Sequence, residues 1–457
     1  MRLRNAVITL LIISVLSGGT VVSAETLTLD QCIEHALKTR ANVIIARGRE
    51  SLAGKDKLRA FGKFLPTVEA TYNYNKGRQF NISPMSGDKF KDTIIVTTIG
   101  SETARDVFRI PVTFRDEQDL GPDKSLTISA GATFSFSNVF NYLGASASHG
   151  AAHLAAIDTE QELIYQVKTV YYNYLRAVQS EEVNKQAVER SKEQLKLVES
   201  RYELGSAAYS DVLSQRVLYG TDRLELLKAQ NNMATTKAVL SYTAGLDPNE
   251  DVEFSTVDDM REYEGTLEQA IGFGISHEPG YLSSLKDYSA SGYGVKTTLA
   301  EYLPKITAFA RYTDFAGTQA FPVVFNYSFN SINYGFQVTY SIFDGFGKQR
   351  EIGRSKISRN NAGAALSDTR NRVVQQIKIA YADIQNQKEG LLVAEETVAA
   401  AEEDMKIVQE RYNLGAATIL DLLKAQENLK RAQVSFINTR FSLNLSIANL
   451  ENSMGKP

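Results

Sequence analysis

Two stretches 210 residues apart carry the side chains most able to do chemistry in this chain. Residues 201–213 read RYELGSAAYSDVL and residues 411–423 read RYNLGAATILDLL. In each stretch an Asp follows the Gly by six positions, at Asp211 and Asp421. A single surface Asp is unremarkable, but several carboxylates gathered around a narrow opening hold cations and select ions by charge. The question is which elements could gather them.

The remaining reactive side chains form no recognisable catalytic or metal-binding set. His149 and His153 have i, i+4 spacing, but they lack the adjacent Glu of a helical zinc motif and a Cys partner. Cys32, the only cysteine, excludes an intrachain disulfide, and its counterpart in the second half is Ala270, which indicates a small packing residue. We find no nucleophile–base–acid trio and no glycine-rich phosphate loop. We therefore expect no enzymatic activity, no cofactor and no metal.

The termini and the charge balance indicate an exported protein that does not bind nucleic acid. Arg2 and Arg4 precede an apolar run over residues 6–16, and Val22-Ser23-Ala24 is a small-residue cleavage site. We therefore predict a signal peptide over residues 1–24, and no Cys follows it to carry a lipid. The formal net charge is −3, without a basic block. No later apolar run reaches 18 residues, so membrane insertion would have to use strands.

Internal matches predict two tandem structural repeats. LDQCI at residues 29–33 matches LEQAI at residues 267–271, and the same offset aligns Leu65-Pro66 with Leu303-Pro304. The two stretches that open this section match at a different offset, 210. Such internal matches indicate that the same structural unit occurs twice in the chain. We predict a first repeat over residues 25–245, an acidic linker over 246–264 and a second repeat over 265–457.

Each repeat contains two segments that alternate between apolar and polar residues. They cover residues 66–74 and 125–137 in the first repeat, and 304–315 and 331–343 in the second. A membrane strand needs about 9–11 residues with this pattern; a half-buried soluble sheet gives the same signal. The export signal and the strand lengths favour the membrane. Four strands cannot close into a barrel of eight or more, so copies of the chain must share one.

Long helices follow the strands in each repeat. Apolar residues recur with alternating spacings of four and three from Val373 to Tyr412, which is the seam of a coiled coil. The matching seam in the first repeat has polar residues at Glu181, Asn184 and Ser191. We predict long helices over residues 145–203 and 348–413, roughly 90–100 Å each at about 1.5 Å per residue. Return helices follow over 210–243 and 418–452, and a shorter helix precedes each first strand. The fold class is α+β.

The stretches that open this section are helix hairpins in this scheme. Gly205 and Gly415 end an unbroken helical pattern, the position of a left-handed C-cap. Thr418 and Asp421 form a T-x-x-D start signal for the return helix. Ala208 replaces the Thr in the first repeat, so we expect a weaker cap there.

The order and spacing of these features resemble the TolC-like outer membrane efflux protein family. The resemblance rests on the tandem helix–strand–strand–helix halves, the Leu-Pro pairs, Phe343-Asp344-Gly345 after a last strand, and the R-Y-x-L-G-x-A motifs. It implies a homotrimer with a shared 12-stranded barrel in the outer membrane and a helical tunnel through the periplasm. It also implies that the closed tip opens when a periplasmic adaptor and an inner-membrane pump, of the RND or ABC class, dock.

The resemblance also assigns roles to residues at the hairpin tips. It makes Tyr202 and Tyr412 gate residues and Asp211 and Asp421 constriction carboxylates. It implies that four residues form the turns that contact the adaptor: Leu204, Gly205, Leu414 and Gly415. The sequence departs from the family pattern at Ala417, where an Arg can serve an ionic gate, and at Ser214 and Lys424, where a second carboxylate ring can form.

We therefore expect a passive exit duct of a tripartite efflux or type I secretion system. One alternative is an outer-membrane-anchored enzyme, which predicts convergent polar residues inside the barrel. The inward positions are mostly Ser, Thr, Asn and Gln. The other alternative is a soluble coiled-coil scaffold, which predicts dispensable strands. The polar stretch over residues 75–124 is the longest insertion between paired strands.

Overall fold

The structure is a computed structural model that describes residues 26–83, 90–99, 102–111, 114–247, 252–256, 262–320 and 324–456. Side-chain environments are described outside residues 77–122 and 318–326. The predicted signal peptide, residues 1–24, lies outside the described residues. The chain divides into two compact units. The first comprises Met1–Leu52, Gly150–Asp287 and Gly363–Pro457, and the second comprises Ala53–His149 and Tyr288–Ala362.

The elements follow one another in two similar series. The first series is α1 (Leu29–Thr39), α2 (Ala41–Gly62), β1 (Thr67–Ser83), β2 (Phe90–Ile99), β3 (Glu102–Pro111), β4 (Phe114–Phe134), α3 (Phe136–Glu203) and α4 (Tyr209–Thr243). The second is α5 (Leu267–His277), α6 (Pro279–Ala300), β5 (Lys305–Ala320), β6 (Val324–Thr339), α7 (Gly347–Asn413) and α8 (Ile419–Ser453).

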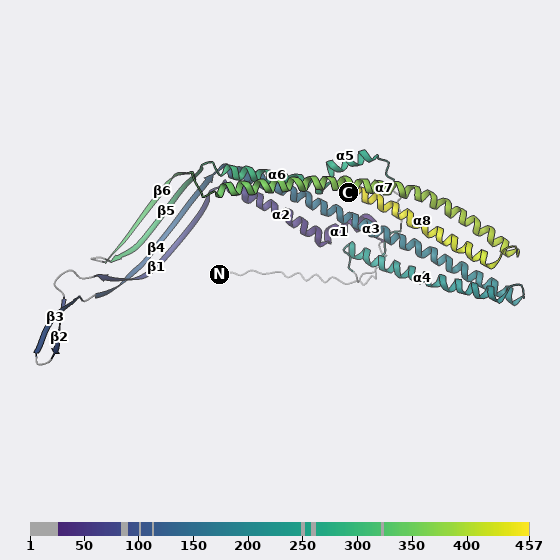
Figure 1. Cartoon of the computed structure of the whole chain (residues 1–457), viewed down its shortest axis with the longest axis horizontal. Helices are drawn as coiled ribbons and strands as arrows, with labels where there is room; N and C mark the ends of the chain where they lie inside the picture. The colour runs from purple at the N-terminus through teal and green to yellow at the C-terminus, as the bar shows by residue number, and fades with distance from the viewer. Residues whose placement is uncertain are drawn as a thin grey trace, which may run out of the picture. The chain divides into compact units, whose positions relative to one another are not determined.

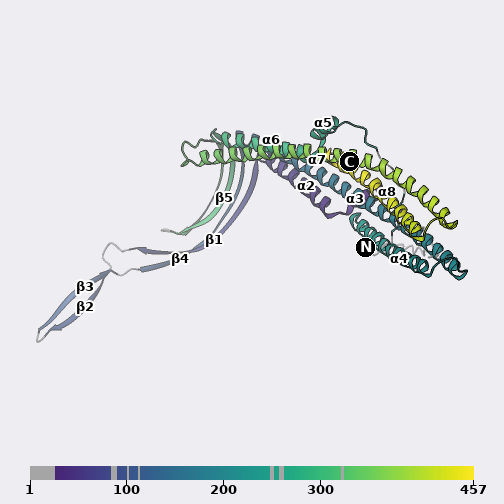
Figure 2. The same cartoon turned by 45° about the vertical axis from the view of Figure 1, so that its right-hand side comes forward.

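The second unit contains a four-stranded antiparallel sheet in the order β1-β4-β5-β6, with β2 and β3 forming a separate two-stranded sheet (Figure 2). Each repeat supplies one hairpin, and β4 of the first pairs with β5 of the second from Lys124–Ala316 to Phe134–Ile306. Within the described part of the chain, β1 pairs only with β4 and β6 only with β5. The sheet therefore has two open edges, whose backbone groups can pair with further strands.

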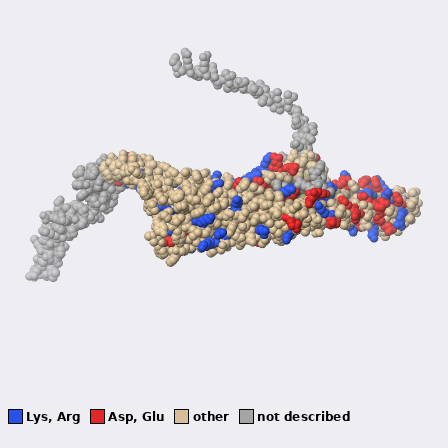
Figure 3. Space-filling model, turned by 90° about the horizontal axis from the view of Figure 1, so that it is seen from above, with Lys and Arg blue, Asp and Glu red and all other residues tan. Residues whose placement is uncertain are grey.

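The register aligns the apolar residues of the four strands on one face. Directly opposite residues share a face in an antiparallel pair, and one such row is Ala70, Ile128, Tyr312 and Ile332. This face is exposed in the single chain: Ile332 is 70% exposed and Tyr334 81%. Figure 3 shows few charged side chains over the described strands on the face that it presents. An exposed apolar surface of this size marks contact with lipid or with another chain.

The strands run farther than the alternation predicts at one end and stop earlier at the other. β1 continues to Ser83 and β4 begins at Phe114, so the pairing extends into the predicted loop over residues 75–124. A polar strand pair has no apolar alternation to detect, although its backbone still pairs. At the other end β4 stops at Phe134, not Ser137, and α3 begins at Phe136, not residue 145.

A polar side chain caps the start of each long helix, although only α3 begins well before its predicted residue. The Asn138 backbone N–H donates to Ser135 Oγ at 3.3 Å, so Ser135 begins α3. In the second repeat β6 ends at Thr339, before the predicted residue 343, and the Lys348 backbone N–H donates to Asp344 Oδ2 at 2.9 Å. The polar side chain at each junction turns an extended segment into a helix within a few residues.

The first unit consists mainly of two helix hairpins, α3 with α4 and α7 with α8, which lie side by side (Figure 1). Among the described residues no helix combines the length and apolarity needed to cross a membrane. Three apolar clusters hold the helices together, and α8 contributes to all of them: Ile437 and Phe441 to the first, Leu443, Ile447 and Leu450 to the second, and Ile419 and Leu422 to the third.

The predicted seam is confirmed along α7. Val373, Ile377, Ala380 and Ile384 are buried, and the seam positions beyond them are less exposed than most of their neighbours. In α3 the polar seam residues Asn184 and Ser191 are also buried, and each bonds to the backbone of its own helix. The predicted linker packs too: Phe254 is 4% exposed and pairs with Leu27 in an isolated bridge.

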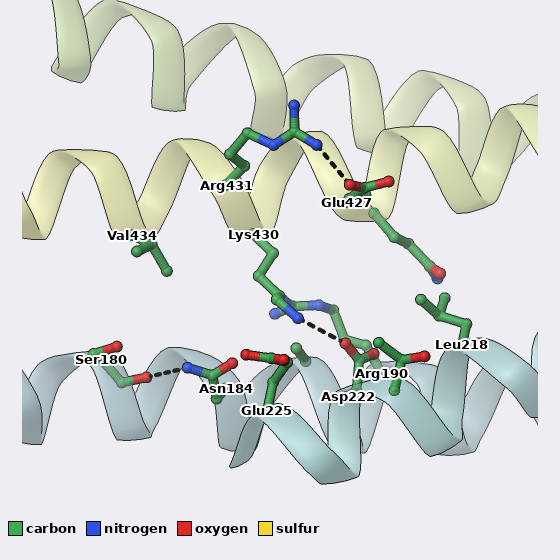
Figure 4. A pocket seen from close by; sticks show the side chains of 13 residues that line it. Ser180, Asn184, Arg190, Leu218, Asp222, Glu225, Glu427, Lys430, Arg431 and Val434 are labelled. Carbon is green, nitrogen blue, oxygen red and sulfur yellow. Dashed lines mark hydrogen bonds and ion pairs between the residues drawn. The ribbon is translucent and has the colours of Figure 1, made fainter. Parts of the chain in front are cut away.

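Buried ion pairs tie the two repeats together. Lys168 Nζ on α3 lies 2.9 Å from Glu451 Oε2 on α8, with both side chains largely buried. Lys430 Nζ on α8 lies 2.9 Å from Asp222 Oδ1 on α4, and the Asp222 side chain is only 6% exposed. Figure 4 shows this second pair inside a groove between the hairpins. A buried carboxylate is costly unless it is paired, so Asp222 depends on a cation.

We predict that Lys430→Met destabilises the chain, because it removes the partner of Asp222. Breaking a buried pair costs about 3–5 kcal/mol, and the partial exposure of Lys430 lowers our expectation to about 1–3 kcal/mol. The measurement is the midpoint of thermal denaturation by circular dichroism. Lys228→Met is the matched control, since Lys228 pairs with Glu225 on the surface of the same helix pair. Adding Asp222→Leu to Lys430→Met should restore the midpoint; a variant as stable as Lys228→Met would contradict the role of the pair.

Candidate functional site

The two hairpin turns have the same backbone geometry. Gly205 and Gly415 both have φ of 75°, the left-handed conformation that favours glycine. The Gly205 N–H donates to Tyr202 O at 2.9 Å and the Ser206 N–H to Arg201 O at 2.8 Å. The corresponding bonds recur from Gly415 and Ala416. This is the Schellman arrangement, and the predicted left-handed C-caps are therefore confirmed.

The return helices start differently in the two repeats. The Asp421 N–H donates to Thr418 Oγ1 at 3.2 Å and the Thr418 N–H donates to Asp421 Oδ2 at 3.0 Å, which completes a capping box. The Thr418 N–H and the Thr418 hydroxyl, whose Oγ1 lies 2.7 Å from Asp421 Oδ2, both donate to this carboxylate and hold the pKa of Asp421 below its usual value. Ala208 offers no side-chain acceptor, and only its N–H donates to Asp211, at 3.3 Å. The first cap is therefore the weaker one, as its sequence predicts.

The two tyrosines expected to act as gate residues, Tyr202 and Tyr412, have different environments. Tyr412 is 7% exposed and belongs to the apolar cluster that joins the tips of the two hairpins, with Val198, Val212, Ile419 and Leu422. Burial raises the pKa of its phenol. Tyr202 is 46% exposed and lies against Tyr209 of its own hairpin, with ring centroids 5.5 Å apart. Tyr412 ends the apolar seam of the second repeat, and Tyr202 holds the matching position 210 residues earlier, so the seam predicts that both are buried. This prediction is right for Tyr412 and wrong for Tyr202.

A cavity of about 490 Å³ lies between the two turns. Its lining brings together three of the predicted site residues, Asp211, Tyr412 and Gly415. The remaining five, Tyr202, Leu204, Gly205, Leu414 and Asp421, are not part of the lining. Leu204 and Leu414 are 83% and 84% exposed, so each turn presents a bare leucine at its end.

The departures from the family pattern also lie at this site. Ala417 and Ser214 line the cavity, so neither adds a charge to it. Lys424, three residues after Asp421, contributes to lowering the pKa of that carboxyl through its positive charge.

Arg201 is the residue that sequence reasoning missed. Its guanidinium lines the same cavity and reaches from the first hairpin to the end of α7. The only signal was its place at the head of the repeated R-Y-x-L-G motif, which Arg411 shares.

A second, larger cavity of about 580 Å³ is the groove around the Asp222–Lys430 pair. Residues of α3, α4 and α8 line it, and Figure 4 shows Arg190 and Glu225 on its α3/α4 side and Glu427 and Arg431 on its α8 side. Charges of both signs are mixed along it. The lining indicates packing between helices rather than a pocket for one small ligand.

The residues considered for metal binding and for nucleophilic chemistry have ordinary surroundings. His153 Nδ1 lies 2.8 Å from Glu50 Oε1 on the surface. Cys32 is fully buried, and burial raises the pKa of its thiol to about 11. Within the described ranges no three His, Cys, Asp or Glu side chains lie close enough to share an ion.

Comparison with known proteins identifies the chain. The model of the family described as "Outer membrane efflux protein" matches residues 118–246 and 284–456, which is about two thirds of the sequence. The chain belongs to the outer membrane efflux protein family. The membership confirms the resemblance read from the sequence, and it places the chain in the outer membrane.

Individual members of the outer membrane efflux protein family are distant in sequence. The chain is 23% identical to the outer membrane efflux protein BepC of Brucella suis over 65% of its own length and 64% of that of BepC. It is 21% identical to TolC of Escherichia coli over 65% of the chain and 62% of TolC. The matched part thus spans less than two thirds of these relatives.

Among solved structures, the outer membrane protein VceC of Vibrio cholerae matches with a TM-score of 0.74 at 18% identity. The match covers 94% of this chain and 96% of VceC. At this identity the likeness establishes the fold, including the long helix hairpins and the antiparallel sheet.

We predict that the two caps respond oppositely to exchange of their N-cap residues. Thr418→Ala removes an acceptor worth about 1 kcal/mol, so amide exchange in the first turn of α8 should quicken about five-fold. Ala208→Thr supplies the missing acceptor and should slow exchange in the first turn of α4 by a similar factor. The measurement is hydrogen–deuterium exchange at neutral pH.

The acid dependence of the second cap has a definite sign. The pKa of Asp421 is lowered in the folded chain, so its stabilisation is present above the ordinary carboxyl pKa and is lost as pH falls through the lowered value. Unchanged exchange in Thr418→Ala, or equal acid sensitivity of the α8 start with and without the threonine, would contradict this account.

Proposed function

We propose that the chain forms a passive outer-membrane exit duct in a tripartite efflux or type I secretion system. The observation that carries the proposal is the pair of hairpin tips with a cavity of about 490 Å³ between them, in a chain of the outer membrane efflux protein family. The duct itself is not an enzyme in this proposal. Energy for transport comes from an inner-membrane transporter of the RND or ABC class, and a periplasmic adaptor protein joins the two.

The sheet supports a homotrimer. It has an exposed apolar face and two open edges, and lipid cannot satisfy unpaired backbone groups. Pairing β6 of one copy with β1 of the next closes both edges of the four-stranded sheet, and three copies supply twelve strands.

An exposed apolar surface on α4 also supports assembly. It consists of four residues that recur at heptad-like spacing: Leu213, Val217, Leu224 and Leu227. A stable monomer free of detergent would contradict this assembly.

The tips supply the gate in this proposal. Asp211, Asp421, Tyr202 and Tyr412 surround the constriction when the copies assemble. Opening separates the hairpins at the cavity, which loosens the cluster around Tyr412. The exposed turns, Leu204-Gly205 and Leu414-Gly415, meet the adaptor.

We predict that Asp211→Ala combined with Asp421→Ala raises conductance and weakens block by divalent cations in planar bilayers. The reason is that a ring of carboxylates holds cations at the narrow end. The control is Glu34→Ala with Asp56→Ala, which removes the same charge from exposed positions on α1 and α2. If the double variant has the conductance and the divalent-cation block of the wild type, Asp211 and Asp421 do not form the constriction.

We predict that Gly415→Trp abolishes most export while the trimer still assembles and inserts. A Cβ atom added at Gly415 meets no heavy atom within 4 Å, so the position opens to the outside, where a bulky side chain would obstruct a partner. Gly415→Ala is the matched control, because both variants share the strain of a left-handed backbone, about 1 kcal/mol. Export is followed by dye accumulation in cells deleted for the native gene, and assembly by native electrophoresis. Equal loss of export in both variants would assign the effect to backbone strain and not to partner contact.

A further inference from the structure

We propose that Arg201 is an intrachain clasp that holds the tips of the two hairpins together, and that its release is a step of opening. The inference rests on the proposed function, since it names the residue that holds the gate closed. It assigns this role to one arginine of a repeated pair.

The contacts of Arg201 run from the end of α3 to the end of α7. Nη1 donates to Tyr412 O at 3.3 Å, and Nη2 lies 3.3 Å from Asn413 Oδ1 and 3.5 Å from Asn413 O. The guanidinium carbon also lies 5.0 Å from the centroid of the Tyr412 ring. One side chain of the first hairpin therefore holds both the backbone and the aromatic ring at the turn of the second.

Each of these contacts suits an arginine. The carbonyls in the last turn of a helix carry a partial negative charge, which a cation complements. Tyr412 O already accepts from the Gly415 N–H at 3.1 Å, and Arg201 adds a second donor to it. A planar guanidinium donates to two acceptors at once and stacks on an aromatic face, which a lysine ammonium does less well. The ring it covers belongs to Tyr412, which is buried in the tip cluster, so the clasp and the cluster stabilise the same closed arrangement.

The two repeats are not equivalent in this respect. Arg411 holds the same place in the second motif, but its Nη2 donates to Ala416 O at 3.2 Å, within its own turn. Ala417 in the same cavity adds no charge. Among the described tip residues Arg201 is thus the cation whose hydrogen bonds cross between the hairpins, and Arg411 provides a natural control of identical chemistry.

Separation of the hairpins at the cavity must break these contacts. Tyr412 cannot leave the cluster without losing the guanidinium that covers it, and the end of α7 cannot move without losing its donors. Asp211 lines the same cavity as Arg201, so a carboxylate is available near the arginine as the tip opens.

The test compares Arg201→Ala, Arg201→Lys and Arg411→Ala in the full-length trimer, with two measurements. The first is conductance in planar bilayers without adaptor or pump. We expect Arg201→Ala to raise it at least three-fold, Arg201→Lys to give a smaller increase, and Arg411→Ala to match the wild type. Conductance unchanged in Arg201→Ala, or raised equally in Arg411→Ala, would overturn the clasp.

The second measurement is amide exchange at residues 412–416, on the opposite hairpin. We expect it to quicken at least five-fold in Arg201→Ala and less in Arg201→Lys. A merely local helix-end role would quicken exchange only around residues 202–206, and this result would overturn the proposal. If wild-type trimers fail to conduct, the proposed duct fails, but exchange across the hairpins still decides the role of Arg201. Should Arg201→Ala not fold, Arg201→Lys carries both measurements.

Discussion

The packing of α8 is the constraint on which the rest of the helical unit depends. This one helix enters all three apolar clusters, and its buried residues cover more than one face, including Leu429, Ala432, Phe441 and Asn444. It also carries Lys430 and Glu451, whose ion pairs reach α4 and α3. Within the helical unit α8 therefore joins the first repeat to the second, as the pairing of β4 with β5 joins them in the sheet. Because the clusters are separate along its length, the tip cluster can loosen while the other two remain packed, as expected for local opening at the low-stability end of a structure.

The tips show how one motif yields two environments. Both hairpins share the Schellman turn and the Asp after the glycine, yet Thr418 caps its helix where Ala208 does not, and Tyr412 is buried where Tyr202 is exposed. The backbone of each hairpin is dictated locally, by glycine and by the helix ends. What the side chains touch is dictated by the neighbouring hairpin. The two repeats thus share a backbone geometry while their side-chain contacts differ. In the proposed gate the second turn is therefore held more firmly than the first.

Much of the fold follows from the sequence, because its main signals are local. The seam along α7, the glycine caps and the alternating strand faces depend on periodicities of a single element, and the structure confirms them at Val373, Gly415 and Ile332. The extension of β1 and β4 was missed because polar strands give no alternation, and the early start of α3 because the cap at Ser135 outweighs the strand pattern before it. Arg201 was missed for another reason: its partners lie more than 200 residues away, and no spacing within its own helix points to them.

In the proposed assembly the sheet and the gate depend on each other. An exposed apolar face with two open edges is incomplete in a single chain, since lipid offers no partner for the edge strands. In the proposed trimer, closing the sheet brings three copies of every tip contact around one axis. Each tip contact then occurs three times, and the three contributions to the free energy of the closed state add up, even where each is small. Opening the tip of one copy alone widens the constriction only slightly, because the tips of the other two copies still narrow it. The gate of such an assembly should therefore open most readily under a partner that engages all three tips, and the bare leucines at the turns, three pairs in the trimer, present the surface for that engagement.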